Sequence, residues 1–192
     1  NNFSSLVYKY TGNPKEKDGE YQTALAILYA ISYTIKMSKK SERRIDGYFD
    51  YVVPPLEGFW WQEKRGAIVC GFDYKDKSSF NWISAIRLPD FVRQKDFEWA
   101  KESAAAKKGL DCSRAQLLGI EEGDCVQILH KGSYDDEPAS VKMMDDFAAA
   151  NGFALDLSAA RLHHEIYLSD PRKTSAEKLK TVLRHPVRKI KR

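Results

Sequence analysis

The stretch Glu20–Met37, EYQTALAILYAISYTIKM, decides the fold class, because residues suited to burial recur in it at three- and four-residue intervals. This spacing is typical of an amphipathic helix with one wide buried stripe. The stripe consists of Tyr21, Ala24, Leu25, Leu28, Ser32 and Ile35. The segments on either side have strand composition, so the sequence predicts a domain that combines helices with a sheet.

Several segments in the first half have the β-branched and aromatic composition of strands. Turn residues, among them Gly12-Asn13-Pro14 and Pro89, separate these segments. The expected strands are Phe3–Tyr10, Tyr48–Val53 continuing past Pro54-Pro55 into Gly58–Gln62, Ala67–Phe72 and Phe80–Leu88. Together with the helix, the first half is predicted to follow the order strand, helix, strand, strand.

The second half is expected to repeat this order with different residues. Its elements are a strand at Cys125–Lys131, a capping turn at Gly132–Asp135, a helix at Pro138–Ala150 and a strand at Leu162–Ser169. Each unit alone is too small to bury a sheet. We therefore expect the two antiparallel sheets to pair and to leave a ligand cleft along their junction.

The predicted fold is a single α+β domain over residues 1–192. Its parts are pseudo-repeats at about 1–89 and 110–170, a linking helix at 90–108 that ends at Gly109, and a C-terminal helix and tail at 171–192. The C-terminal helix is expected over Thr174–Val182, because Ser175 and Glu177 suit a first helical turn.

The composition is that of an ordinary globular protein, with 43% hydrophobic and 30% charged residues among 192. No apolar run reaches the roughly 18 to 20 residues of a membrane span, and the N-terminal residues lack the basic region followed by an apolar stretch that is typical of a signal peptide. We therefore expect a cytoplasmic protein without a membrane partner. Much of the net charge of +4 lies in Arg184–Arg192, which we interpret as a solvated or frayed end. No direct contact with nucleic acid is expected.

The three cysteines, Cys70, Cys112 and Cys125, are an odd number at wide spacing. This pattern favours neither a disulfide framework nor a structural zinc site, and it fits a reducing cytoplasm. Cys125 opens an apolar strand, where an inert buried thiol is expected.

Two aromatic and acidic stretches are candidates for a ligand site: Pro54–Trp61 (PPLEGFWW) and Leu162–Pro171 (LHHEIYLSDP). Each places a carboxylate within a few residues of large rings, which suits a flat, apolar and sometimes cationic ligand. In the second stretch, strand periodicity places His163, Glu165 and Tyr167 on one face. A glutamate among rings on a central strand is either a functional acid or base or one half of an ion pair.

The same periodicity separates neighbouring residues. Trp60 and Trp61 face opposite ways in a strand, so only one of them can line a pocket. His163 and His164 cannot bind one metal ion for the same reason, and neither a metal nor an organic cofactor is expected.

Other candidates have two interpretations each. Trp82 points either into the cleft or into the core, and Tyr29 and Tyr33 either close one end of the cleft or pack on the helix. Glu57 is either a pocket carboxylate or a solvated turn residue. His130 is more often a satisfied core histidine than a cleft residue.

Six motifs in the same order resemble the GyrI-like small-molecule-binding proteins. They are Gly12-Asn13-Pro14, Tyr29–Lys36, Pro54–Trp61, Arg87–Val92, Glu122–His130, and His163–Arg172 followed by Glu177–Lys180. The resemblance covers nearly the whole chain and is greatest to the stand-alone subfamily. Gly132-Ser133-Tyr134 stands where the family often has Gly-Pro-Tyr, which leaves the turn and Tyr134 in place.

The resemblance implies a duplicated strand-helix-strand-strand fold whose cleft has an aromatic lining and one acidic residue. The family includes drug-sensing regulators, proteins that shield DNA gyrase, and stand-alone proteins similar to hydrolases that open the cyclopropane ring of DNA-alkylating natural products. This chain is most similar to the last group. This similarity implies a cofactor-free hydrolase that acts in xenobiotic detoxification and drug resistance, with hydrophobic aromatic small molecules as partners. Whether the chain forms a homodimer stays open.

The residues expected to carry this activity come from several predicted strands. Glu165 is the expected general base and Tyr167 the expected catalytic partner. The expected substrate-binding residues are Trp60, Trp61, Trp82, Phe91, Tyr134 and His163. The alternative is a non-catalytic protein that binds, sequesters or senses lipophilic cations in the same aromatic cage.

Overall fold

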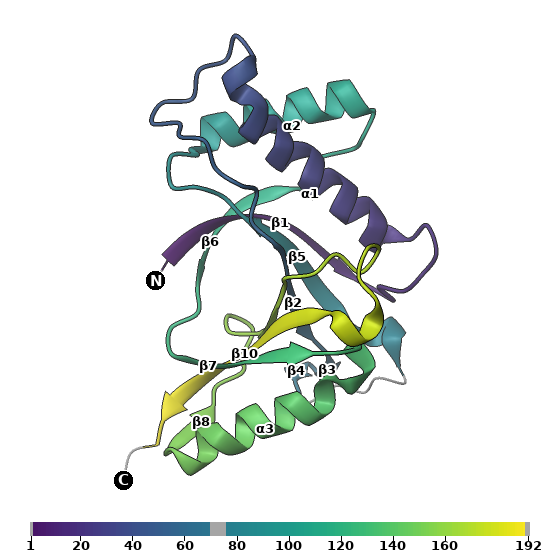
Figure 1. Cartoon of the computed structure of the whole chain (residues 1–192), viewed down its shortest axis with the longest axis vertical. Coiled ribbons are helices and arrows are strands. Elements are labelled where there is room, and N and C mark those ends of the chain that lie inside the picture. The colour runs from purple at the N-terminus through teal and green to yellow at the C-terminus, as the bar shows by residue number, and fades with distance from the viewer. Residues whose placement is uncertain (1, 70–75, 191–192) are drawn as a thin grey trace.

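One antiparallel sheet runs through the molecule and joins its two halves (Figure 1). The computed structural model describes residues 2–69 and 76–190. The strands lie in the order β6-β1-β5-β2-β9-β10-β7, and β8 pairs with β10. Their bounds are β1 Asn2–Thr11, β2 Leu56–Trp61, β5 Asn81–Arg87, β6 Gln116–Glu121, β7 Cys125–Lys131, β8 Phe153–Leu155, β9 His163–Tyr167 and β10 Lys180–Lys189. A separate hairpin consists of β3 Glu63–Lys64 and β4 Ala67–Ile68.

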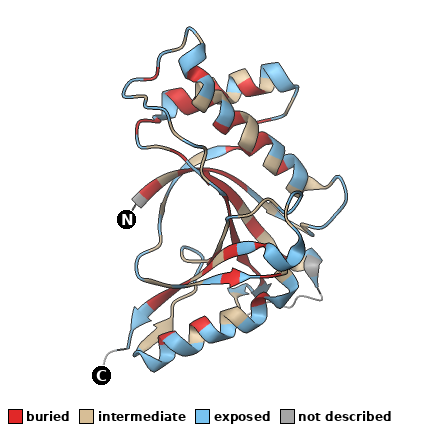
Figure 2. Cartoon of the chain, viewed as in Figure 1, coloured by how far each residue is buried: buried red, intermediate tan, exposed pale blue. Residues whose placement is uncertain are grey.

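The helices divide between the two ends of the sheet (Figure 1). Helices α1 Glu20–Lys36 and α2 Gln94–Lys108 lie against each other, and α1 covers β1 and β5. Helix α3 Glu137–Ala150 covers β7, β8 and β10 at the other end. Short 3-10 turns occupy Met37–Lys40, Lys77–Ser79, Tyr134–Asp136 and Ala176–Lys178. Buried residues gather on the central strands and on the helix faces toward them (Figure 2).

The two halves of the chain occupy the two sides of the sheet and meet at the neighbouring strands β2 and β9. The first half contributes β1-β5-β2 and the second contributes β7-β10-β9, so each reads strand, helix, strand, strand along the chain. At the junction, Gly58 lies opposite Glu165 and Trp60 lies opposite His163. The predicted α+β fold with antiparallel sheets is confirmed.

Local sequence signals set two of the helices. The residues of α1 that become buried are Ala24, Ile27, Leu28, Ile31, Ser32 and Ile35, which is the predicted stripe with two additions and without its two outer members, Tyr21 and Leu25. Helix α2 ends at Gly109, whose φ of 65° lies in the left-handed region that favours glycine. It begins four residues later than predicted, at Gln94, with Asp96 accepting from the Arg93 backbone N–H at 3.2 Å.

The C-terminal helix predicted at Thr174–Val182 is wrong. Only the turn Ala176–Lys178 is helical, and the chain then forms the ten-residue strand β10. Alternate residues Thr181, Leu183, His185 and Val187 are all buried. This period of two, between β9 and β7, outweighs the weak helix-start signal of Ser175 and Glu177. The basic segment from Arg184 to Lys189 is therefore part of the sheet and not a frayed end.

The strand predictions differ from the structure in other places as well. Tyr48–Val53 forms no strand, and β6 and β8 were not predicted. Of the strand predicted at Ala67–Phe72, only Ala67–Ile68 is seen, and residues 70–75 lie outside the described residues, as does Cys70. Burial raises the pKa of the Cys112 and Cys125 thiols, which disfavours the reactive thiolate. Cys112 is buried, whereas Cys125, which was expected to be buried, is half-buried.

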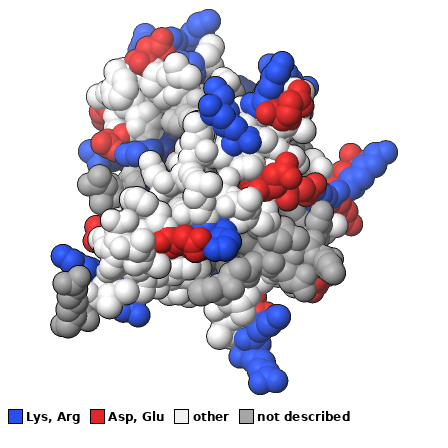
Figure 3. All heavy atoms as spheres, turned by 60° about the horizontal axis from the view of Figure 1, so that its bottom comes forward, with Lys and Arg blue, Asp and Glu red and all other residues white. Residues whose placement is uncertain are grey.

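Charged side chains of both signs are interspersed among uncharged ones on the face shown in Figure 3. Within residues 2–69 and 76–190, no helix has the length and apolar character needed to cross a bilayer.

Candidate functional site

A cluster of aromatic and acidic residues occupies the junction of the two units, on one face of β2 and β9. We call it the junction site. Helix α1 contributes Tyr21, and the start of α3 with its preceding turn contributes Tyr134 and Glu137. The strands contribute Trp60 from β2 and His163, Glu165 and Tyr167 from β9.

Glu165 is held by two hydrogen bonds at the centre of the junction site. The Tyr167 hydroxyl donates to Oε2 at 2.7 Å, and His163 Nε2 lies 3.1 Å from Oε1. The Trp60 indole N–H donates to the Tyr167 hydroxyl at 2.9 Å. The Glu165 side chain is only 12% exposed. His163, Glu165 and Tyr167 thus share one face of β9, as the period of two requires.

The tyrosines around Glu165 keep their protons. Burial, followed by the negative charge of Glu165, raises the pKa of Tyr167 and of Tyr21 well above their ordinary values. Tyr134, whose ring meets Tyr167 edge-on at 6.0 Å, has a pKa raised to about 12, mainly by burial. All three phenols are therefore available as hydrogen-bond donors at neutral pH.

Glu137 is a second carboxyl group at the junction site and was not predicted. The residue is 5% exposed, and its Oε1 has no hydrogen-bond partner among the described residues. Burial, followed by the negative charge of Glu165, raises the pKa of Glu137 to about 9. It is therefore a neutral acid at neutral pH. Its sequence position gives no such signal, because an acid beside Pro138 at a helix start is ordinarily solvated.

Gly58 makes room for this arrangement and was also missed. A Cβ at this position would lie 2.5 Å from Trp60 Nε1 and 2.7 Å from the Tyr167 hydroxyl. Only glycine lets these two groups meet over the strand. The available signal is a glycine in the interior of a strand, between Glu57 and Phe59.

The two adjacent tryptophans face opposite ways, as predicted. Trp60 lies in the junction site, where its ring is 5.9 Å from that of Tyr21. Trp61 lies on the other face, donates to Glu63 Oε1 at 3.0 Å and borders a hollow of about 320 Å³ with Lys9. Trp61 is therefore not part of the junction site.

Trp82 and Phe91 do not join the junction site directly. Trp82 is buried in the core behind Tyr21, 5.1 Å between ring centroids, and its indole N–H donates to the Gly12 carbonyl at 3.3 Å. Phe91 packs 5.2 to 5.9 Å from three rings of the preceding segment, which are Tyr48, Phe49 and Tyr51.

The other face of β9 carries a cluster that we call the rear cluster: Glu57, Phe59, Glu122, His164 and Arg184. His164 lies between two carboxylates, with Nδ1 2.7 Å from Glu122 Oε1 and Nε2 3.0 Å from Glu57 Oε2. Its ring stacks on Phe59 at 4.1 Å, and Arg184 pairs with Glu122. Glu57 is therefore buried in an ion pair and is neither a pocket carboxylate nor a solvated turn residue.

The charge of His164 follows from these partners. Burial lowers its pKa, but the hydrogen bonds to Glu122 and Glu57 outweigh burial and raise the pKa above the ordinary value. His130 is a satisfied core histidine, with Nδ1 2.9 Å from Ser140 Oγ and Nε2 3.0 Å from the Ser133 carbonyl. Within the described part of the chain, no cluster of histidine, cysteine, aspartate and glutamate is arranged to hold a metal ion.

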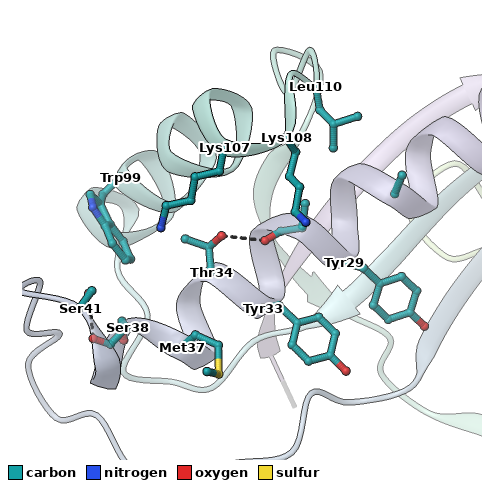
Figure 4. Close-up of a pocket in the computed structure, with 12 residues that line it drawn as sticks. Tyr29, Tyr33, Thr34, Met37, Ser38, Ser41, Trp99, Lys107, Lys108 and Leu110 are labelled. Carbon is teal, nitrogen blue, oxygen red and sulfur yellow. Dashed lines mark hydrogen bonds between the residues drawn. The ribbon is translucent and has the colours of Figure 1, made fainter.

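A groove of about 590 Å³ lies between α1 and α2, away from Glu165 (Figure 4). Tyr29, Tyr33 and Trp99 line it together with Lys107 and Lys108 at the end of α2. Tyr29 and Tyr33 therefore border this groove, while the rings of the junction site pack against one another.

Residues 6–188 of this chain match the family model of the GyrI-like small molecule binding domain. The chain belongs to the GyrI-like family. Such a domain binds small molecules, which agrees with an aromatic site between two units. Among curated proteins, none matches this sequence.

Solved structures show the same fold for this GyrI-like chain. A hydrolase from Listeria innocua is 47% identical, with a TM-score of 0.85 over 97% of this chain and 88% of its own. An uncharacterized conserved protein from Listeria innocua is 49% identical, with a TM-score of 0.89 over the same shares. The C-terminal domain of EcmrR is 12% identical with a TM-score of 0.58, over 98% of this chain and 93% of its own, and so shows the fold alone.

Proposed function

We propose that this GyrI-like protein binds flat, largely apolar xenobiotics at the junction site and hydrolyses the cyclopropane ring of cyclopropanoid DNA-alkylating compounds, which protects the cell. The observation that carries this proposal is Glu165, a nearly buried carboxylate held by Tyr167 and His163 among rings from both units. The similarity to a Listeria protein described as a hydrolase supports it.

Binding would use rings from four elements. Tyr21, Trp60, Tyr134 and Tyr167 come from α1, β2, the turn before α3 and β9. A planar ligand that enters between Tyr134 and Tyr167 replaces their edge contact with stacking on both of its faces. Each aromatic pair contributes about 0.5 to 1.5 kcal/mol beyond the burial of area.

The reaction uses both carboxyl groups. Glu165 takes a proton from water while the water oxygen bonds to a cyclopropane carbon conjugated to a dienone. The carbon–carbon bond breaks, and its electron pair moves through the dienone to the carbonyl oxygen. Glu137, which is neutral at this pH, gives its proton to that oxygen, so the product is a phenol. General catalysis of this kind typically contributes 10² to 10⁴-fold.

The test is turnover with excess cyclopropane dienone in ¹⁸O-labelled water, followed by mass spectrometry of the ring-opened product. We expect many equivalents of product carrying one labelled oxygen. Glu165→Gln should lower the rate by about 10² to 10⁴-fold, whereas Glu102→Gln, an exposed position on α2, should leave it unchanged.

The second candidate is a non-catalytic protein that binds, sequesters or senses lipophilic cations. Two carboxyl groups among rings favour it, because Glu165 and Glu137 can both oppose a positive charge once a ligand displaces the proton of Glu137. Product that stops at or below one equivalent would establish this function instead. Glu165→Gln would then weaken cation binding and spare neutral ligands.

A further inference from the structure

A continuous row of hydrogen bonds leads from Glu165 to a carboxylate on α3. Glu165 Oε1 lies 3.1 Å from His163 Nε2, and His163 Nδ1 lies 2.7 Å from His185 Nε2. At the far end, His185 Nδ1 lies 2.7 Å from Oδ1 of Asp145, whose side chain is 27% exposed. The two histidines are almost fully buried. The row therefore joins a nearly buried carboxylate to one that solvent reaches.

The protons in this row can be counted, because each hydrogen bond needs one and an ionised carboxylate only accepts. Burial lowers the pKa of His163, so this imidazole is neutral and carries a single ring proton. When Glu165 is ionised, that proton lies on Nε2, and Nδ1 accepts from His185. His185 then donates from both nitrogens, because its other partner is the Asp145 carboxylate. With Asp145 as a carboxylate, ionised Glu165 therefore requires a positively charged His185.

A second arrangement holds the same number of protons. In it Glu165 is protonated, both histidines are neutral, and only Asp145 is charged. The two arrangements interconvert when one proton moves along each inner hydrogen bond, so no co-reactant is needed. Tyr167 favours the first arrangement, because its hydroxyl donates to Glu165 Oε2 at 2.7 Å and such a bond is stronger to an ionised acceptor.

Among the described residues, the groups around Glu165 at the junction site are uncharged. Tyr21 and Tyr167 keep their protons because burial raises their pKa values, and Glu137 stays neutral below about pH 9. Glu165 has a tyrosine and a histidine as hydrogen-bond partners, and among the described residues no lysine or arginine donates to it. Within residues 2–69 and 76–190, the row of hydrogen bonds to His185 is therefore the route by which a positive charge can balance Glu165.

We propose that Asp145, His185 and His163 form a charge relay that keeps Glu165 in its ionised, water-activating form by holding the balancing positive charge on His185. This rests on the proposed function, in which Glu165 is the general base. His185 and Asp145 act only through Glu165, so they are positioning residues.

Nuclear magnetic resonance of the imidazole nitrogens tests the relay without any substrate. The chain has four histidines, so each ring can be assigned. We expect both nitrogens of His185 to carry protons at neutral pH, and His163 to carry one, on Nε2. His164 is an internal reference for a doubly protonated ring, because it donates to two carboxylates.

Asp145→Asn tests the surface end of the relay, and Asp146→Asn is its matched control, because Asp146 pairs with Lys142 on the exposed side of the same helix. In Asp145→Asn, His185 should lose one ring proton at neutral pH. The acid limb of the plot of kcat against pH should shift to higher pH by about one unit. At a given pH on that limb, kcat should therefore be about tenfold lower, while KM is unchanged. Activity should recover at higher pH.

Two results would overturn the relay: a singly protonated His185 in the unmodified protein, or an Asp145→Asn variant whose histidine spectrum and acid limb match those of Asp146→Asn. Should the protein show no turnover, the spectra still decide the relay, while the ¹⁸O experiment alone decides the hydrolase. His185→Gln is a second test of the relay. If this variant folds, the acid limb of its kcat profile should also shift to higher pH.

Discussion

His163 and His164 are neighbours on β9, yet they are placed in opposite electrostatic surroundings. His163 faces the junction site, where burial lowers its pKa and keeps the ring neutral. His164 faces the rear cluster, where hydrogen bonds to two carboxylates overcome burial and raise the pKa. The strand period of two separates the neighbours, and their partners then set their charges.

The difference shows which face stabilises the sheet and which face is suited to chemistry. In the rear cluster, His164 contacts both Glu57 and Glu122, and Arg184 pairs with Glu122, so each of these charged groups has a partner. The cluster connects β2, β9 and β10. In the junction site, Glu137 keeps a buried oxygen without a partner among the described residues. Unsatisfied buried polar groups cost stability, so their presence is typical of functional sites.

The largest expected effect comes from breaking the rear cluster. His164→Gln leaves Glu57 as a buried carboxylate without its cation and Glu122 with Arg184 alone, which should lower the free energy of unfolding by about 3 to 5 kcal/mol. His163→Gln removes neutral hydrogen bonds and should cost about 1 to 3 kcal/mol. Urea denaturation at neutral pH measures both. Equal costs would show that the two histidines do not differ in charge.

The same pair predicts a pH dependence. Because the folded-state pKa of His164 is raised, its stabilisation is fully present below the ordinary histidine pKa of 6.5 and is lost as the pH rises through the raised value. The gap in unfolding free energy between the unmodified protein and His164→Gln should therefore narrow at high pH. A gap that widens instead would contradict the assignment of a charged His164.

Gly58→Ala should have an intermediate effect, on activity more than on stability. The added Cβ would meet Trp60 Nε1 at 2.5 Å and the Tyr167 hydroxyl at 2.7 Å, and so displace Tyr167 from Glu165. A displacement of about 1 Å at a catalytic group can cost about 10²-fold in rate. Turnover of the cyclopropane dienone measures this loss.

The double variant Gly58→Ala with Trp60→Phe is the control for simple crowding. Phenylalanine removes the indole nitrogen that lies nearest to the new Cβ. Thermal stability should therefore recover in part, because the contact of the Cβ with the Tyr167 hydroxyl remains, while turnover stays low because the bond from Trp60 to Tyr167 is absent. Full recovery of turnover would mean that this bond does not position Tyr167.

Glu137→Gln should affect stability in the opposite direction, because it should be stabilising at high pH. Burial raises the pKa of Glu137 from 4.5 to about 9, so the folded state of the unmodified protein loses stability as the pH rises between these values. Glutamine stays neutral throughout. Calorimetry should give equal Tm values near the lower limit and a higher Tm for Glu137→Gln near the upper one. Glu102→Gln should show no such trend.

Much of the fold could be predicted from short-range patterns. The helix at Glu20–Lys36, the strand at Cys125–Lys131 and the helix that ends at Gly109 follow from periodicity and from capping chemistry. Strand β10 could not be predicted in this way. Its alternation is weak in isolation, and the segment becomes a strand because β7 and β9 pair with it on both sides.

The candidate site divides in the same manner. The sequence by itself determined that His163, Glu165 and Tyr167 share a face and that Trp60 and Trp61 do not, because the side-chain period of a strand is a local property. Only the tertiary structure decided which tryptophan meets Tyr167, that Glu137 is buried beside Glu165, and that Asp145 and His185 extend the row from His163. These contacts join segments far apart in the chain, and burial sets their charges, so neither can be read from local spacing.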